Sequence, residues 1–391
     1  MDSTVPSGSP LFLGFNPVLH SLRGCAACAV VLFHWEQHFP AAGQWLQQFF
    51  PTDTVLDPTS YIGFGWMGVP LFFILSGWLL GAQVVANDPS PQFLRRFWLR
   101  RFLRIYPAVW AELLVLLLVA GAIPGLITQA GYDTLPFQFL LWVNLPPVMV
   151  EPINLVWWTL PVELGFYLIL PLLGLVSRWV DWRVMLLSAL LITLFWRSWV
   201  FLGANVDNYI TTLPVLDSLI GVLFTFMLGF SMNFLPGVLS VWARRRLFWC
   251  GAVLLLALMQ WQLSLNDVYW TGHWILVVWT PMVALAIALL VFSLREPTWE
   301  WRWLGSKVLV WLGHVSFGIY LWHFQVMRAL VLLWPELWST PSMSLLALII
   351  SLPATLALAA VSYYCIERPL MSWGKDRFNV AAPEQSFKQS Q

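Results

Sequence analysis

An arginine and a histidine, Arg23 and His34, stand in a stretch of sequence that is otherwise almost entirely apolar. If this stretch is a helix with a rise of 1.5 Å per residue, the two side chains are separated by roughly 16 Å along its axis. Because the hydrocarbon core of a bilayer is about 30 Å thick, Arg23 can lie at one membrane face while His34 lies near mid-depth. A titratable imidazole at that depth indicates a functional site. A histidine that only hydrogen-bonds to a neighbouring helix is the alternative interpretation.

A carboxylate, Glu163, lies at a comparable depth in the apolar segment 156–177. If this segment enters from the opposite membrane face, Glu163 is roughly 10 Å deep. A carboxylate beside an imidazole would orient the ring and stabilise its charged form, which is the arrangement that general-base catalysis requires. The sequence leaves open whether Glu163 and His34 touch.

Three polar residues, Ser316, Tyr320 and His323, occur at positions i, i+4 and i+7 of the apolar segment 308–334. Residues with this spacing share one face of a helix. The segment therefore predicts a polar stripe that either contacts a partner helix or lines a cavity.

Two further patterns allow both a structural and a binding interpretation. Arg101 and Arg104 are three residues apart and would share a helix face. Their planar guanidinium groups suit phosphate, although a topogenic, lipid-facing cluster explains them as well. Ser76 and Gly77 form a small pair that permits a close approach of a neighbouring helix or of a threaded ligand.

The composition predicts the elements that position these residues. The chain has 391 residues, of which 59% are hydrophobic and only 10% are charged, whereas soluble domains carry about 25% charged residues. We therefore expect an all-α, polytopic transmembrane bundle of about ten spans. The predicted spans are 22–39, 61–86, 102–123, 156–177, 184–203, 213–236, 247–264, 271–294, 308–334 and 343–366. The proline-interrupted stretch 137–149 is expected to be interfacial or re-entrant.

The distribution of charge predicts the orientation of the bundle. With both termini in the cytoplasm, every Lys and Arg except Arg197 and Arg328 falls on the cytoplasmic side, as the positive-inside rule requires. Two acidic residues within the spans, Glu112 and Asp217, could pair with these two arginines. Glu367 at the inner boundary is interpreted as a structural lock. A net charge of +1 gives no nucleic-acid footprint, and no metal site is predicted.

In this order, the segments resemble the membrane-bound acyltransferase 3 family from about Leu19 to Trp373. The most specific element is an arginine and a histidine separated by ten residues, which Arg23 and His34 match. The other matching segments are Phe72 to Gly77, the Arg101/Arg104 pair, Trp158 to Tyr167, Ser316 to His323, and Glu367 to Pro369. We divide the chain accordingly into a cytoplasmic tail (1–18), the acyltransferase domain (19–373) and a disordered cytoplasmic tail (374–391).

The resemblance implies a multi-pass protein of a bacterial inner membrane that transfers an acyl group from cytoplasmic acyl-CoA, with acetyl-CoA as the expected donor. The implied acceptor is a hydroxyl of an envelope glycan or another carbohydrate, and no cofactor is held permanently. The resemblance implies His34 as the catalytic base and Glu163 as its support. It implies that the donor and its acyl path are contacted by Arg23, Arg101, Arg104, Ser76, Gly77, Tyr320 and His323.

Several positions depart from the family pattern. His20 and Pro70 stand where members of the family commonly have aspartate, and Leu164 stands where many have a second acid. An arginine expected near Leu213 to Asp217 is missing. These departures affect the subfamily and the acceptor contacts more than the base.

Other mechanisms and functions stay open on the sequence alone. His34 could act as a general base in direct transfer or could form an acyl-histidine intermediate. Buried His and Glu side chains also suit the proton relay of a transporter or flippase. A scaffold subunit without chemistry, and an enzyme that acylates lipids or proteins, are further alternatives. The oligomeric state is not predicted.

Overall fold

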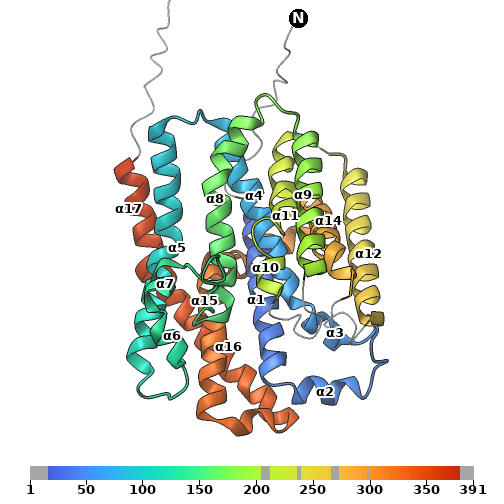
Figure 1. The fold of residues 1–391 in the computed structure, drawn as a ribbon. Helices are drawn as coiled ribbons and strands as arrows, with labels where there is room; N and C mark the ends of the chain where they lie inside the picture. The colour runs from blue at the N-terminus through green and yellow to red at the C-terminus, as the bar shows by residue number, and fades with distance from the viewer. Residues whose placement is uncertain (1–15, 204–211, 236–238, 266–272, 297–298, 379–391) are drawn as a thin grey trace, which may run out of the picture.

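The computed structural model describes residues 16–203, 212–235, 239–265, 273–296 and 299–378. Within these ranges the regular structure is entirely helical, and the helices form one bundle (Figure 1). In the part of the chain that the structure describes, nine helical segments are long and apolar enough to cross a membrane: Pro17–His38 (α1), Pro58–Ala86 (α3 to α4), Pro91–Val119 (α5), Leu155–Val176 (a 3₁₀ turn and α8), Trp182–Gly203 (α9), Val241–Leu265 (α12), Ile275–Leu294 (α14), Lys307–Leu333 (α15) and Pro341–Gly374 (α16 to α17). The predicted polytopic helical bundle is confirmed.

The sixth predicted span, 213–236, is not one continuous helix. It consists of a short helix α10 (Leu213–Leu216), an irregular stretch, and the helix α11 (Leu223–Ser231) followed by a 3₁₀ turn. Figure 1 shows α11 continuing from α10 toward the end of the bundle where α12 begins. Hydropathy detected the apolar residues of this span but could not detect the break, because broken backbone at membrane depth depends on polar partners from other helices.

Polar contacts define the two ends of the bundle. At the end that we call the arginine-rich end, ion pairs and a hydrogen bond join Asp88 with Arg178, Arg244 with Glu296, and Asn16 with Arg295. At the opposite end, hydrogen bonds join Val55 with Gln260, Gly125 with Arg328, and Ile153 with Gln325. Successive connections between the helices alternate between these two ends, in agreement with the charge pattern. The membrane face at which each end lies stays a prediction.

Glycines bring two pairs of helices into backbone contact. A Cβ atom at Gly313 of α15 would lie 1.9 Å from the carbonyl oxygen of His20 on α1. A Cβ atom at Gly77 of α4 would lie 2.0 Å from the carbonyl oxygen of Phe226 on α11. Only glycine permits such an approach, so α1 is held against α15 and α4 against α11. Gly77 therefore has the helix-packing role that the sequence allowed.

The C-terminal helices close the arginine-rich end. After α16 (Pro341–Ser362), a π-helical turn spans Tyr363–Glu367 and leads into α17 (Arg368–Phe378). Glu367 in this turn is 1% exposed and pairs with Arg104 of α5 at 2.8 Å. The predicted lock at Glu367 is confirmed. The helix α17 runs past the expected domain end at residue 373, while residues 1–15 and 379–391 of the predicted tails lie outside the described residues.

The segment after α5 includes the proline-interrupted stretch 137–149. It forms two short helices, α6 (Gln129–Asp133) and α7 (Leu135–Leu140), and a loop that leads to Asn154. Gln138 holds this loop through hydrogen bonds to the backbone of Glu151 and Ile153. The segment thus contributes no span of its own.

Candidate active site

Two adjoining cavities lie among the helices that carry the predicted residues. The cavity nearer the arginine-rich end, here called the inner cavity, lies between α1, α4, α8 and α15 and measures about 40 Å³. Its polar lining residues are Arg23, Thr159, Glu163, Ser316 and Tyr320. The second, here called the outer cavity, measures about 100 Å³ and contains His34.

The two cavities share part of their lining. Val69 and Phe73 of α4 and Tyr320 of α15 line both. The hydroxyl of Tyr320 donates to the carbonyl of Val156 at 2.9 Å and lies 3.0 Å from the hydroxyl of Thr159. These bonds fix the Tyr320 ring between the cavities, so a group that passes from one cavity to the other must pass beside it.

Glu163 belongs to the inner cavity. One carboxylate oxygen accepts hydrogen bonds from Ser76 of α4, at 2.8 Å, and from the hydroxyl of Tyr167 one turn along α8. A carboxylate that accepts two such bonds is held firmly in position. Ser76 therefore connects α4 to the predicted acid.

The arginines near this carboxylate fall into two kinds. Arg23 lies over the ring of Phe72, 5.5 Å from its centroid, and Arg101 lies 5.9 Å from the centroid of Tyr167. Both are within electrostatic range of Glu163. Among the described residues, neither guanidinium has a protein hydrogen-bond acceptor. Arg104, in contrast, is already paired with Glu367.

Unoccupied guanidinium donors near a membrane face attract anions, and phosphate in particular. Arg23 lines the inner cavity, and Arg101 lies beside Tyr167, which bonds to Glu163. The binding of the donor phosphates by these two arginines stays a prediction. The contact of Arg104 with the CoA phosphates stays a prediction, and any such contact would have to coexist with the Glu367 ion pair.

His34 contacts a second histidine and not the predicted acid. Nδ1 of His34 lies 2.9 Å from Nε2 of His323 and 3.1 Å from the carbonyl oxygen of Val30. Glu163 is bonded to Ser76 and Tyr167 instead. Equal depth did not imply contact, because Glu163 faces the inner cavity and His34 lines the outer one. The possible pairing of Glu163 with His34 is therefore wrong.

The hydrogen bonds assign the tautomer of both rings. Nδ1 of His323 lies 3.0 Å from the carbonyl oxygen of Ile319, which can only accept, so this nitrogen carries the proton. Nε2 of His323 is then an acceptor for Nδ1–H of His34. In neutral His34 the unprotonated nitrogen is therefore Nε2, which has the lone pair that a general base needs.

The polar stripe predicted on α15 is confirmed. Ser316 lines the inner cavity, Tyr320 lines both cavities, and His323 reaches His34. The stripe was the sequence signal for the true partner of His34. Gly77, by comparison, packs against α11, and its contact with the acyl path stays a prediction.

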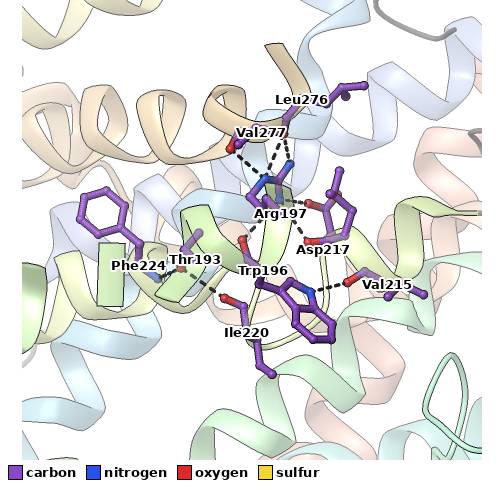
Figure 2. Close-up of polar contacts among 11 residues, drawn as sticks. Thr193, Trp196, Arg197, Val215, Asp217, Ile220, Phe224, Leu276 and Val277 are labelled. Atoms are coloured by element: carbon purple, nitrogen blue, oxygen red, sulfur yellow. Dashed lines mark hydrogen bonds and ion pairs between the residues drawn. The ribbon is translucent and has the colours of Figure 1, made fainter. Parts of the chain in front are cut away.

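The outer cavity also contains Asp217, which the sequence singled out only as a possible ion-pair partner. Asp217 pairs with Arg197 at 2.7 Å, as one of the predicted pairings had it. Figure 2 shows this contact beside the other bonds of Arg197. Glu112 pairs with neither arginine, since it accepts hydrogen bonds from Asn154 at 2.6 Å and Trp157 at 2.8 Å.

The rest of the outer cavity combines aromatic rings and hydroxyls. Trp66 and Trp158 line it together with Thr225 and Thr280. Tryptophan rings can form belts or stack on sugars, and these two lie beside the candidate base. Within the described ranges, no group of three His, Cys, Asp or Glu side chains could hold a metal ion.

Comparison with known proteins extends this description. A family model described as an acyltransferase domain matches residues 16–364. The chain is 24% identical to the peptidoglycan O-acetyltransferase of Listeria monocytogenes, over 92% of this chain and 56% of the relative. It is 24% identical to a putative O-acetyltransferase of Staphylococcus aureus (93% and 59% covered) and 27% identical to a putative acetyltransferase of Acidianus two-tailed virus (79% and 82%).

These relatives differ in length. The chain spans less than two thirds of the length of the Listeria and Staphylococcus proteins and about four fifths of the viral one. No solved structure matches the chain significantly.

Proposed function

Because the chain belongs to the acyltransferase 3 family, we propose that it is an integral membrane O-acyltransferase that moves an acetyl group from acetyl-CoA to a hydroxyl of an envelope glycan. The observation that carries this proposal is the arrangement of the two cavities. Arg23, whose guanidinium has no protein acceptor among the described residues, lines one cavity, His34 lines the other, and shared residues connect them.

The donor is proposed to enter from the arginine-rich end, which the charge pattern assigns to the cytoplasm. Arg23 and Arg101 would bind the phosphates of the CoA nucleotide, since their donors have no protein acceptor within the described residues. The thioester end would then extend past Ser76 and Tyr320 toward His34. Cavities of about 40 and 100 Å³ suit an acetyl group better than a long acyl chain.

The chemistry proposed for His34 is general-base catalysis. Nε2 takes the proton of the acceptor hydroxyl as that oxygen attacks the thioester carbonyl carbon. The carbon–sulfur bond then breaks, and the departing thiolate takes the proton back from the imidazolium, which leaves an ester and free CoA thiol. His323 accepts the Nδ1–H bond of His34 and thereby keeps Nε2 directed at the reactants.

The acceptor is proposed to be a carbohydrate because the relatives are named as O-acetyltransferases, one of them of peptidoglycan. The aromatic and hydroxyl lining of the outer cavity supports a sugar. A bacterial inner membrane is the location that this acceptor and the arginine-rich cytoplasmic end together favour.

The experiment uses the purified protein in nanodiscs with acetyl-CoA, with and without a bacterial envelope-glycan extract, and measures the release of free thiol. We expect acceptor-dependent release by the wild type and a loss of about 10²–10⁴-fold in His34→Ala, the range that general-base catalysis contributes. His38→Ala is the matched control, since His38 follows one turn later on α1 and lines neither cavity.

Two results would contradict the proposal. One is undiminished transfer by a folded His34→Ala variant. The other is movement of a glycan across proteoliposomes without any consumption of acetyl-CoA, which would favour the transporter or flippase instead. Intact-mass measurement of the protein during turnover separates direct transfer from an acyl-histidine intermediate, because only the latter adds an acetyl group to the chain.

A further inference from the structure

The outer cavity contains a carboxylate that the proposed reaction does not use. Asp217 is 27% exposed and lines this cavity together with His34. Its Oδ1 atom accepts from Arg197 at 2.7 Å. Within the described residues, its Oδ2 atom has no protein hydrogen-bond partner. The position of this carboxylate in the membrane interior therefore needs an explanation beyond the ion pair.

The backbone break beside Asp217 is held by one face of α9. Thr193 donates to the carbonyl of Ile220 and accepts from the amide of Phe224. Trp196 donates to the carbonyl of Val215 at 3.0 Å. Figure 2 shows these bonds around the irregular stretch between α10 and α11. Backbone of this kind is tolerated at membrane depth where other groups satisfy it and where it lines a cavity.

Arg197 completes this support and fixes Asp217. It is 1% exposed. Besides Asp217, it donates to the carbonyls of Leu216 and Gly221 in the break and to Leu276 and Val277 of α14. The carbonyl of Val277 lacks its usual helical partner because Pro281, four residues later, has no N–H.

These contacts make Asp217 a hydrogen-bond acceptor in a fixed position. Oδ1 of Asp217 is paired with the buried guanidinium of Arg197 at 2.7 Å, and the oxygen atoms of a carboxylate in such a pair only accept hydrogen bonds. A ligand that meets Oδ2 in the outer cavity must therefore bring a donor, such as a hydroxyl. An anionic group at this position would be repelled.

The remaining lining fits the same ligand. Thr225 and Thr280 offer hydroxyls, and Trp66 and Trp158 offer aromatic rings. A sugar ring has hydroxyls at its edge and C–H groups on its faces, so it can satisfy both kinds of lining at once.

We propose that Asp217 is the acceptor-binding residue, which accepts a hydrogen bond from one hydroxyl of an uncharged sugar while a neighbouring hydroxyl faces His34. This inference rests on the proposed acyltransferase function. Asp217 would determine specificity for hydroxyl-rich, uncharged rings over anionic ones, and Arg197 would position it.

The test compares Asp217→Asn with the wild type in nanodiscs. Asparagine can still accept from Arg197 but presents a neutral amide to the cavity. We expect the KM for the glycan extract to rise about ten- to a hundredfold, the factor that corresponds to one charge-assisted hydrogen bond. The KM for acetyl-CoA should stay unchanged. Asp88→Asn is the control, since Asp88 is in an Arg–Asp pair far from the cavity.

A second variant distinguishes a loss of acceptor binding from misfolding. Asp217→Glu keeps the charge that Arg197 needs but moves the carboxylate by one methylene, so it should fold and still raise the acceptor KM. Unchanged acceptor KM values in both variants, or equal rises in the donor KM, would overturn the inference. A rise confined to the acceptor KM supports it.

Failure of the proposed function can be distinguished from failure of this inference. If the wild type releases no thiol with any extract, the acyltransferase proposal fails. Equilibrium dialysis of a radiolabelled N-acetylglucosamine tetramer then tests the inference alone. If the wild type binds the tetramer and Asp217→Asn does not, the acceptor site is supported. Equal binding by both proteins, or no binding by either, would overturn the inference.

Discussion

Two arginines on membrane-spanning helices, Arg23 and Arg197, show opposite uses of the same side chain. The guanidinium of Arg197 donates from all three nitrogens, to Asp217 and to backbone carbonyls of α14 and of the broken sixth span. Arg23 lies over an aromatic ring beside the inner cavity, and within the described residues it has no protein acceptor. Residue type does not separate the two roles. What separates them is whether the protein itself supplies the acceptors.

The comparison extends to the two cavities, because Arg23 lines the inner one and Arg197 pairs with Asp217, which lines the outer one. Arg23, a hydrogen-bond donor, lines the inner cavity together with Glu163, whereas the outer cavity contains two acceptors, Asp217 and Nε2 of His34. The proposed reaction between an anionic donor and a hydroxyl-bearing acceptor uses this difference.

Replacement of Arg197 by methionine should destabilise the fold the most. Removal of one partner of a buried ion pair costs about 3–5 kcal/mol, and here four backbone carbonyls also lose a donor. Thermal unfolding in detergent measures the change. Arg178→Met is the control, because Arg178 is half-exposed and its pair with Asp88 should contribute at most about 1 kcal/mol. Equal losses in both variants would contradict a structural role specific to Arg197.

Replacement of Arg23 by glutamine should impair donor binding without a loss of stability. A charge-assisted hydrogen bond contributes about 1.5–3 kcal/mol, so the kcat/KM for acetyl-CoA should fall about ten- to a hundredfold. Acetyl-pantetheine, which lacks the nucleotide phosphates, should be used equally well by the variant and the wild type. An equal loss with both donors would mean that Arg23 contributes to the reaction in some way other than phosphate binding.

Replacement of His323 by phenylalanine should have the smallest effect, a fall in kcat of about fivefold, because one neutral hydrogen bond contributes about 1 kcal/mol. The KM values for donor and acceptor should not change, since His323 acts on the reactants only through His34. In His323→Gln the side-chain carbonyl can still accept from His34, so part of the activity should return. The lack of any difference between the two variants would exclude the positioning role.

The candidate site was predictable where a single helix carries the signal. The spacing of Arg23 and His34 on α1 and the stripe of Ser316, Tyr320 and His323 on α15 follow from the helical period alone. Depth could also be predicted, since it follows from the rise per residue. The partner of His34 could not, because depth does not fix which way a side chain faces on a helix, and Glu163 faces a different cavity.

A polytopic helical bundle, the depth of its polar residues and the alternation of its connections between two ends could be inferred from the amino-acid sequence, because they follow from hydropathy, rise per residue and charge. The contact of His323 with His34, the packing of Gly77 against α11 and the break of the sixth span at Asp217 became visible only in the folded chain. Each of these depends on which helices are neighbours. The break in particular is stable because α9, more than ten residues away in the chain, supplies the hydrogen-bond donors that the broken backbone needs.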